Sequence, residues 1–107
     1  MAHYLFQAAY TVDAWAAMVK NPQDRIEAIR PVVESLGGTV VAGYLAFGEY
    51  DTVAIVDLPD NEAAAAFAMA ASAGGAVKAL KTTPLLSTQE GLGAAGKAGT
   101  IAYRPPA

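Results

Sequence analysis

The sequence predicts a single α+β domain in which two helices cover one face of a four-stranded antiparallel sheet. Three observations support this prediction. Strand-like apolar segments and segments with a helical apolar period follow one another in the order β-α-β-β-α-β. Clusters of glycine and proline separate them. With 107 residues, of which 54% are hydrophobic, the chain has the length of one domain (residues 1–107) and enough apolar side chains for a core.

The first half of the predicted fold is a strand, a short helix and a longer helix. Residues 3–10 are aromatic and apolar and predict the strand, and residues 12–19 predict the short helix. Asn21 is expected to cap the longer helix, with Pro22 at its first position, where no N–H is needed. Pro31 is expected to kink this helix. Its apolar side chains recur at spacings of three and four residues: Ile26, Ile29, Val33 and Leu36.

The second half begins with two strands, predicted at residues 39–47 and 51–58. The three residues between them, 48–50, begin with glycine and predict a hairpin. Asp60 is expected to cap the second main helix, residues 61–72, which is unusually rich in alanine. Pairs of glycines follow both main helices. They are interpreted as helix stops, because a phosphate-binding glycine loop precedes its helix.

The last predicted elements are a strand and a C-terminal extension. Residues 76–87 predict the fourth strand, with a break at Pro84. A short helix is expected over residues 88–97 and a brief strand over residues 100–103. Right-handed crossovers place both main helices on one face of the sheet and give the strand order 4-1-3-2. This arrangement is a ferredoxin-like topology.

The predicted second and third strands are apolar on both faces. A sheet with one wet face alternates apolar and polar residues, but residues 40–42 and 45–47 are apolar at both parities, and residues 53–56 are apolar without interruption. Two helices cover only one face of a sheet. We therefore expect a second copy of the chain to cover the other face, giving a homodimer or a higher oligomer built from it.

Composition limits the classes of partner. The formal net charge is −3 and the seven Lys and Arg residues are scattered, which argues against binding to nucleic acid or to an anionic membrane. No apolar run approaches the roughly 20 residues of a membrane span, and the N-terminus lacks the pattern of a secretory signal. Because the chain has no cysteine, disulfides and thiolate chemistry are excluded, and we expect a cytoplasmic protein.

Two residues are candidates for acid–base catalysis. His3 is the sole histidine, and on the first strand it can face a pocket and act as a general base. The alternative for His3 is an idle, partly exposed side chain near the N-terminus. Asp51 follows the predicted hairpin, where its carboxylate can orient a base, accept a substrate hydrogen bond, or satisfy the amides of the turn. A lone histidine excludes a histidine metal cluster.

Tyrosines are the candidate ligand-binding residues. Their hydroxyl groups can fix an aromatic or quinone-like ligand, although tyrosines are equally expected at a dimer interface. In an ideal strand Tyr4, Phe6 and Tyr10 lie on one face, and His3 and Gln7 lie on the other. One of these two sets is therefore expected in the core. The four candidates are Tyr4, Tyr10, Tyr44 and Tyr50.

The chain also resembles the GYD-domain family, over five stretches that span nearly all of it. The stretches are Lys20–Arg25, Ser35–Gly38, Phe47–Ala63, Lys81–Thr83 and Tyr103–Pro106. The resemblance implies a dimeric α/β barrel, in which two ferredoxin-like sheets face each other. It implies no particular reaction, because related barrels include cofactor-independent monooxygenases, lactone-processing enzymes and haem-handling proteins.

These observations lead to two functional hypotheses. The first is a dimeric barrel that binds a small hydrophobic or aromatic metabolite as a cofactor-independent enzyme. In that hypothesis Asp51 or His3 performs the acid–base work, the tyrosines shape the pocket, and no metal or cofactor is needed. The second is a non-catalytic module for ligand sensing or oligomeric assembly.

Overall fold

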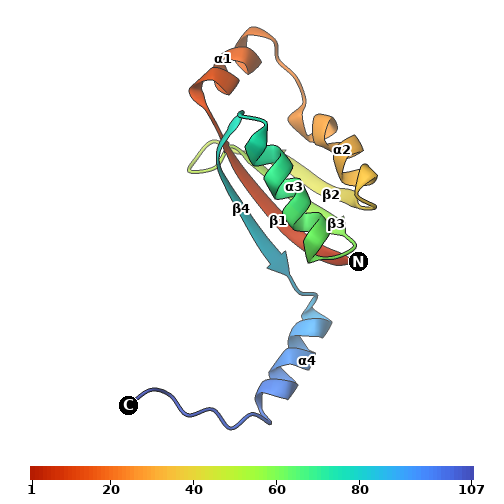
Figure 1. Ribbon diagram of the computed structural model, residues 1–107, viewed down its shortest axis with the longest axis vertical. Coiled ribbons are helices and arrows are strands. Elements are labelled where there is room, and N and C mark those ends of the chain that lie inside the picture. Colours follow the sequence, from red (N-terminus) through yellow and green to blue (C-terminus); the bar gives the residue numbers. More distant parts are fainter.

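The structure is a computed structural model that describes residues 1–107 (Figure 1). The chain forms four strands and four helices; the predicted order β-α-β-β-α-β is present, with the short helix α1 after the first strand and α4 after the last. The elements are β1 (Ala2–Tyr10), α1 (Val12–Lys20), α2 (Arg25–Ser35), β2 (Thr39–Leu45), β3 (Thr52–Leu58), α3 (Asn61–Ala73), β4 (Val77–Leu85) and α4 (Thr88–Ala98).

The four strands form one antiparallel sheet in the order β2-β3-β1-β4. Helices α2 and α3 lie on the same face of this sheet, α2 against β2 and β3, and α3 against β3 and β4 (Figure 1). This is a ferredoxin-like fold, so the predicted fold class and the strand order 4-1-3-2 are confirmed. The opposite face of the sheet carries no helix, and we call it the helix-free face.

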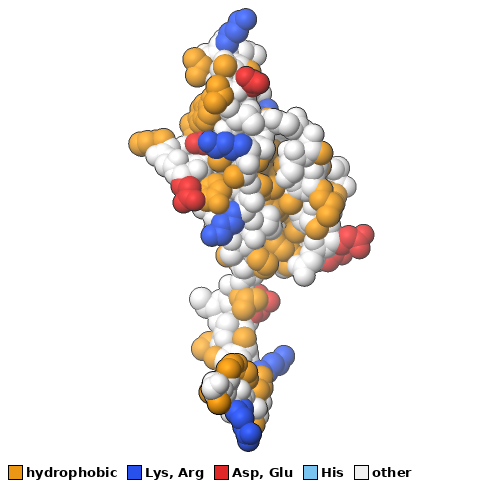
Figure 2. Space-filling model, turned by 60° about the vertical axis from the view of Figure 1, so that its left-hand side comes forward, with side chains coloured by type: hydrophobic (Ala, Val, Ile, Leu, Met, Phe, Trp, Pro, Cys, Tyr) orange, Lys and Arg blue, Asp and Glu red, His pale blue; other side chains and the backbone are white.

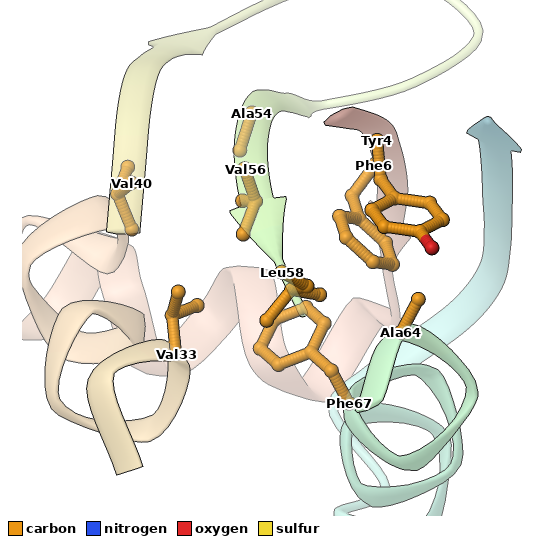
Figure 3. Packing of buried hydrophobic residues seen from close by; sticks show 9 residues of the cluster. All are labelled: Tyr4, Phe6, Val33, Val40, Ala54, Val56, Leu58, Ala64 and Phe67. Atoms are coloured by element: carbon orange, nitrogen blue, oxygen red, sulfur yellow. The ribbon is translucent and has the colours of Figure 1, made fainter. Parts of the chain in front are cut away.

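The core lies between the sheet and the two helices (Figure 3). In β3 every second residue from Thr52 is buried, and in β1 the buried set includes Tyr4 and Phe6. The ring of Phe67 from α3 meets the ring of Phe6 edge to face, with centroids 4.9 Å apart. Each large apolar side chain buried here contributes about 1.5–3 kcal/mol. Alternation along β1 thus places one of the two predicted sets in the core, and the structure shows that it is the tyrosine–phenylalanine set, with His3 on the helix-free face.

The boundary between α1 and α2 differs from the prediction. Asn21 ends α1, with its N–H donating to the carbonyl of Ala17, and does not begin the next helix. Helix α2 begins at Arg25, and its N-cap is Asp24, whose carboxylate accepts two amides of the first turn at 2.9 and 3.1 Å. Asp24 is the better cap because it accepts two hydrogen bonds and places a negative charge at the helix N-terminus. Pro22 therefore precedes the helix.

The connection between β2 and β3 is longer than the predicted three-residue hairpin. Pairing of the two strands ends at Leu45 and Thr52, so that residues 46–51 form the loop. Asp51 is bonded to both neighbouring segments, since its carbonyl accepts the N–H of Ala46 at 2.7 Å and its own N–H donates to the carbonyl of Ala8 on β1 at 2.8 Å. A sequence pattern does not show these backbone contacts between strands.

Near the C-terminus two predictions are wrong. Pro84 does not break β4, since it pairs with Tyr4 on an edge strand, where the missing N–H is tolerated. The brief strand expected at residues 100–103 is absent, and residues 100–107 have no regular structure. No strand lies beside them, because α4 carries this segment away from both edges of the sheet (Figure 1).

Residues 86–107 form a C-terminal arm that projects from one end of the sheet (Figure 1). The arm consists of α4 and the tail, and α4 makes no extensive packing contact with the other helices and strands. The radius of gyration is 17.0 Å, against about 13 Å for a compact domain of this length. None of the helices combines the length and the hydropathy that a membrane crossing requires.

Candidate functional site on the helix-free sheet face

The helix-free face is formed by the side chains of each strand that point away from α2 and α3. Strand pairing aligns Leu5 with Ile55 and Gln7 with Val53, so that Leu5, Ile55 and Val53 form an apolar strip at the centre of the face, with the polar Gln7 beside it. All four are only partly buried. In each strand they alternate with core residues, because successive side chains of a strand point to opposite faces.

His3 and Asp57 form a side-chain pair at one end of this face. The register of β1 and β3 places the two residues directly opposite each other. The imidazole Nδ1 of His3 contacts the carboxylate Oδ1 of Asp57. The His3 side chain is 41% exposed and that of Asp57 is 24% exposed, so the pair is accessible from the helix-free side.

The contact determines which nitrogen of His3 is free to react. A carboxylate accepts a hydrogen bond, so the proton of the neutral imidazole lies on Nδ1 and a lone pair remains on Nε2. No other hydrogen bond of His3 occupies Nε2. An imidazole held by a carboxylate in this way is oriented as a general base, and the carboxylate stabilises the imidazolium that forms.

Asp51 has a different environment, at the opposite end of β1. Its Oδ2 accepts the backbone N–H of Tyr10 at 2.9 Å and the indole Nε1–H of Trp15 at 3.2 Å. The rings of Tyr10 and Trp15 meet edge to face at 5.7 Å. The carboxylate thus ties α1 to the end of β1 and to the start of β3. These contacts favour the turn-stabilising role for Asp51, and about 17 Å of strand separates its neighbour Ala8 from His3.

The four candidate tyrosines lie in three different places. Tyr4 and Tyr10 are buried under the helices, where the Tyr4 hydroxyl donates to Oδ1 of Asn61 at 2.7 Å and the Tyr10 hydroxyl accepts from Thr52 at 2.7 Å. Tyr50 lies in the β2–β3 loop and is partly buried. Tyr44 pairs with Val53 and, at 69% exposure, is the one candidate tyrosine on the helix-free face; Tyr44 therefore shares a face with His3.

Two cavities lie on the helix side of the sheet, and neither includes His3 or Asp57. The first, about 580 Å³, lies between α1, the start of α2 and β2. Its acidic groups already have partners, since Asp24 caps α2 and Glu27 pairs with Arg30 at 3.0 Å. The second, about 310 Å³, lies between α2 and α3 and is almost wholly apolar. The His3–Asp57 pair therefore lies outside both cavities, on the helix-free face.

Asp57 is the site residue that the sequence prediction missed. It is the one charged side chain in the strand Thr52–Leu58, where it follows an unbroken apolar run, and it lies at the parity opposite to the buried residues. A single charged residue after an apolar run could have identified Asp57 as a candidate from the sequence alone. Its pairing with His3 was not visible, because the register of β1 and β3 brings together residues 54 positions apart.

The fold and this site define the chain as a ferredoxin-like α+β protein with a histidine–carboxylate pair on an uncovered sheet face. The model of the GYD domain family matches residues 4–95, and the chain belongs to this family. No curated protein and no solved structure matches the chain. No group of three or more histidine, cysteine, aspartate or glutamate side chains lies close enough to hold a metal ion.

Proposed function

We propose that the helix-free face is an acid–base site for a small hydrophobic or aromatic molecule, with His3 as the base and Asp57 as the residue that orients it. The observation that supports the proposal is the His3–Asp57 pair beside the apolar strip of Leu5 and Ile55. A ligand lying on that strip has its apolar part on the aliphatic side chains and an acidic C–H or O–H near Nε2 of His3.

The proposed step is a proton transfer. The proton passes from the substrate to Nε2, and its electron pair remains on the substrate as an enolate or phenolate. Asp57 stabilises the imidazolium through the hydrogen bond from Nδ1. A positioned general base typically contributes about 10²–10⁴-fold to a rate. The step uses only side chains of this chain and needs no cofactor.

A second copy of the chain completes the proposed site by covering the helix-free face. An apolar strip left in water favours association, at about 25 cal/mol for each Å² that is covered. A covered face also excludes water from the His3–Asp57 pair, which strengthens the electrostatic interactions there. The proposal therefore joins the small-molecule site to a homodimer through the sheet.

The second candidate is a non-catalytic module for ligand sensing or oligomeric assembly. The exposed C-terminal arm favours it, because an arm that packs little against its own domain is suited to bind another subunit. In this case the His3–Asp57 pair contributes to ligand binding or to contacts between subunits, and it transfers no proton.

Proton exchange with solvent distinguishes the two candidates. The protein is incubated in D₂O with a panel of aryl ketones and 1,3-diketones, and the loss of the acidic C–H signal is followed by NMR. We expect exchange about 10²–10⁴-fold faster than with His3→Gln, and a smaller loss with Asp57→Asn. Asp13→Asn, which removes an exposed carboxylate of α1, serves as the matched control.

The nitrogen signals of His3 provide a readout that needs no substrate. Because His3 is the sole histidine, its ¹⁵N signals are unambiguous. The proposal requires the neutral ring to carry its proton on Nδ1, and Asp57→Ala to release that preference. A proton on Nε2, or exchange rates unchanged in His3→Gln, would refute the catalytic role and favour the assembly module.

A further inference from the structure

The C-terminal arm exposes apolar side chains that find no partner within their own chain. Four large ones along its length are between 64% and 77% exposed, and Figure 2 shows hydrophobic atoms on the arm, set apart from the body, with cationic side chains towards its end. They are Leu86, Leu92, Ile101 and Tyr103.

Helix α4 needs a surface to pack against. It has 11 residues, three of which are glycine, and its sequence is TQEGLGAAGKA. Isolated helices shorter than about 12–15 residues are marginal in water even when rich in alanine, and glycine is among the poorest helix formers. The capping box of Ser87 and Glu90 fixes where α4 begins, but its hydrogen bonds stabilise only the first turn of the helix. A surface outside this chain must supply the remaining stabilisation.

The exposed area of the chain is large enough for a dimer interface. The accessible surface is 7318 Å², whereas a compact protein of 11.0 kDa exposes about 5,600 Å². The excess of roughly 1,700 Å² exceeds the area of about 800 Å² that each partner contributes to a standard interface.

Charge makes the arm complementary to the body of another copy. The arm carries Glu90 against Lys97 and Arg104, a net charge of +1, and since the whole chain carries −3, residues 1–85 carry −4. Two bodies repel each other, whereas the arm of one copy is attracted to the body of the other. A second copy therefore fits the arm by charge as well as by apolar surface.

We propose that two copies exchange their C-terminal arms, with α4 of each copy packed on the helix-free face of the other. The inference rests on the proposed function in one respect, namely that a second copy covers this face. In this arrangement the strip of Leu5 and Ile55 forms the floor of the proposed ligand site, and α4 of the other copy forms its roof, so that the ligand lies between them. The arm leaves β4 at the end of the sheet where Leu85 pairs with His3, which is also the end that carries the His3–Asp57 pair.

Engineered cysteine pairs test this arrangement, because the natural chain has no cysteine. Leu92→Cys is co-expressed with Ile55→Cys, one of the two carrying an affinity tag, and the mixed disulfide is isolated after mild oxidation. We expect efficient formation of this product. Met69→Cys, at an exposed position on α3 on the other side of the sheet, is the matched partner for Leu92→Cys and is expected to give little product.

A second variant measures the contribution of the arm in the full chain. Leu92→Asp is expected to weaken dimerisation roughly tenfold or more, as for a residue at the centre of an interface, whereas Met69→Asp leaves it unchanged. Crosslinking of Leu92→Cys to Met69→Cys in preference to Ile55→Cys, or an unchanged dissociation constant for Leu92→Asp, would overturn the exchange. The proposed base is tested separately, because His3→Gln changes proton exchange and leaves the crosslink intact.

Discussion

His3 and Asp51, the two residues considered for acid–base chemistry, lie near opposite ends of β1 and have different partners. His3 contacts a carboxylate on a surface without helices and keeps Nε2 free. Asp51 accepts hydrogen bonds from a backbone amide and an indole, so that its Oδ2 is already occupied. A base needs a free lone pair and an orienting partner, and His3 has both.

Removal of the Asp51 carboxylate is expected to destabilise the fold. Asp51→Ala leaves the N–H groups of Tyr10 and Trp15 without an acceptor, which costs about 1–3 kcal/mol of unfolding free energy. Asp51→Asn keeps one carbonyl acceptor and should cost less. Urea unfolding followed by the fluorescence of Trp15, the sole tryptophan, measures both changes.

Glu49→Ala is the control for these variants, since Glu49 is an exposed acid in the same loop. If Asp51→Ala were as stable as Glu49→Ala but inactive in proton exchange, Asp51 would be a catalytic residue and not a structural one.

At the residue scale, strand parity was predictable and register was not. The alternation of β1 separated Tyr4 and Phe6 from His3, as the structure confirms. The pairing of His3 with Asp57 depends on how two strands align across more than 50 residues, and local sequence carries no such information. For the same reason the sequence could not show that Tyr4 and Tyr44 lie on opposite faces.

At the scale of elements, competition between neighbouring cap residues decides where the first two helices end and begin. Asn21 and Asp24 both have side chains suited to an N-cap, and the structure uses Asn21 to end one helix and Asp24 to begin the next. Asp60 and Ser87 have no such competitor nearby. Helix α3 therefore begins where predicted, and α4, expected over residues 88–97, is longer than predicted by one residue at its C-terminal end. The presence of each helix could therefore be predicted from the sequence. The position of a helix end could not be predicted where two residues compete to cap it.

The capping box of α4 is expected to make this helix sensitive to acid. The backbone N–H and the hydroxyl of Ser87 lower the pKa of Glu90 below its ordinary value of 4.5, with smaller contributions from His3 and the N-terminal amine. Because the pKa is lowered in the folded state, this stabilisation is present above pH 4.5 and is lost as the pH falls through the folded-state pKa. Far-UV circular dichroism should show partial loss of helix below pH 4.5.

The variant Glu90→Gln identifies the source of that change. A glutamine keeps a hydrogen bond to the Ser87 amide without the charge, so its α4 should be weaker at neutral pH and less dependent on acid. An acid transition of equal size in Glu90→Gln would show that other carboxylates cause it.

At the scale of the whole molecule, the structure has two apolar surfaces that its own chain does not cover, the helix-free face and the C-terminal arm. The two-sided apolar character of β3 predicted the first of these surfaces, because Val53 and Ile55 alternate with buried core residues. The arm was not predicted, since the sequence of α4 indicates a helix but not that it leaves the sheet. In the proposed dimer, a second copy covers both surfaces and encloses the His3–Asp57 pair.

The mass of the protein in solution tests this account most directly. Sedimentation equilibrium is measured over a range of micromolar concentrations, and the chain is expected to have twice its mass of 11.0 kDa, with dissociation only on dilution. A stable species of 11.0 kDa over the whole range would contradict the covered sheet face, and with it the enclosed site and the exchanged arm.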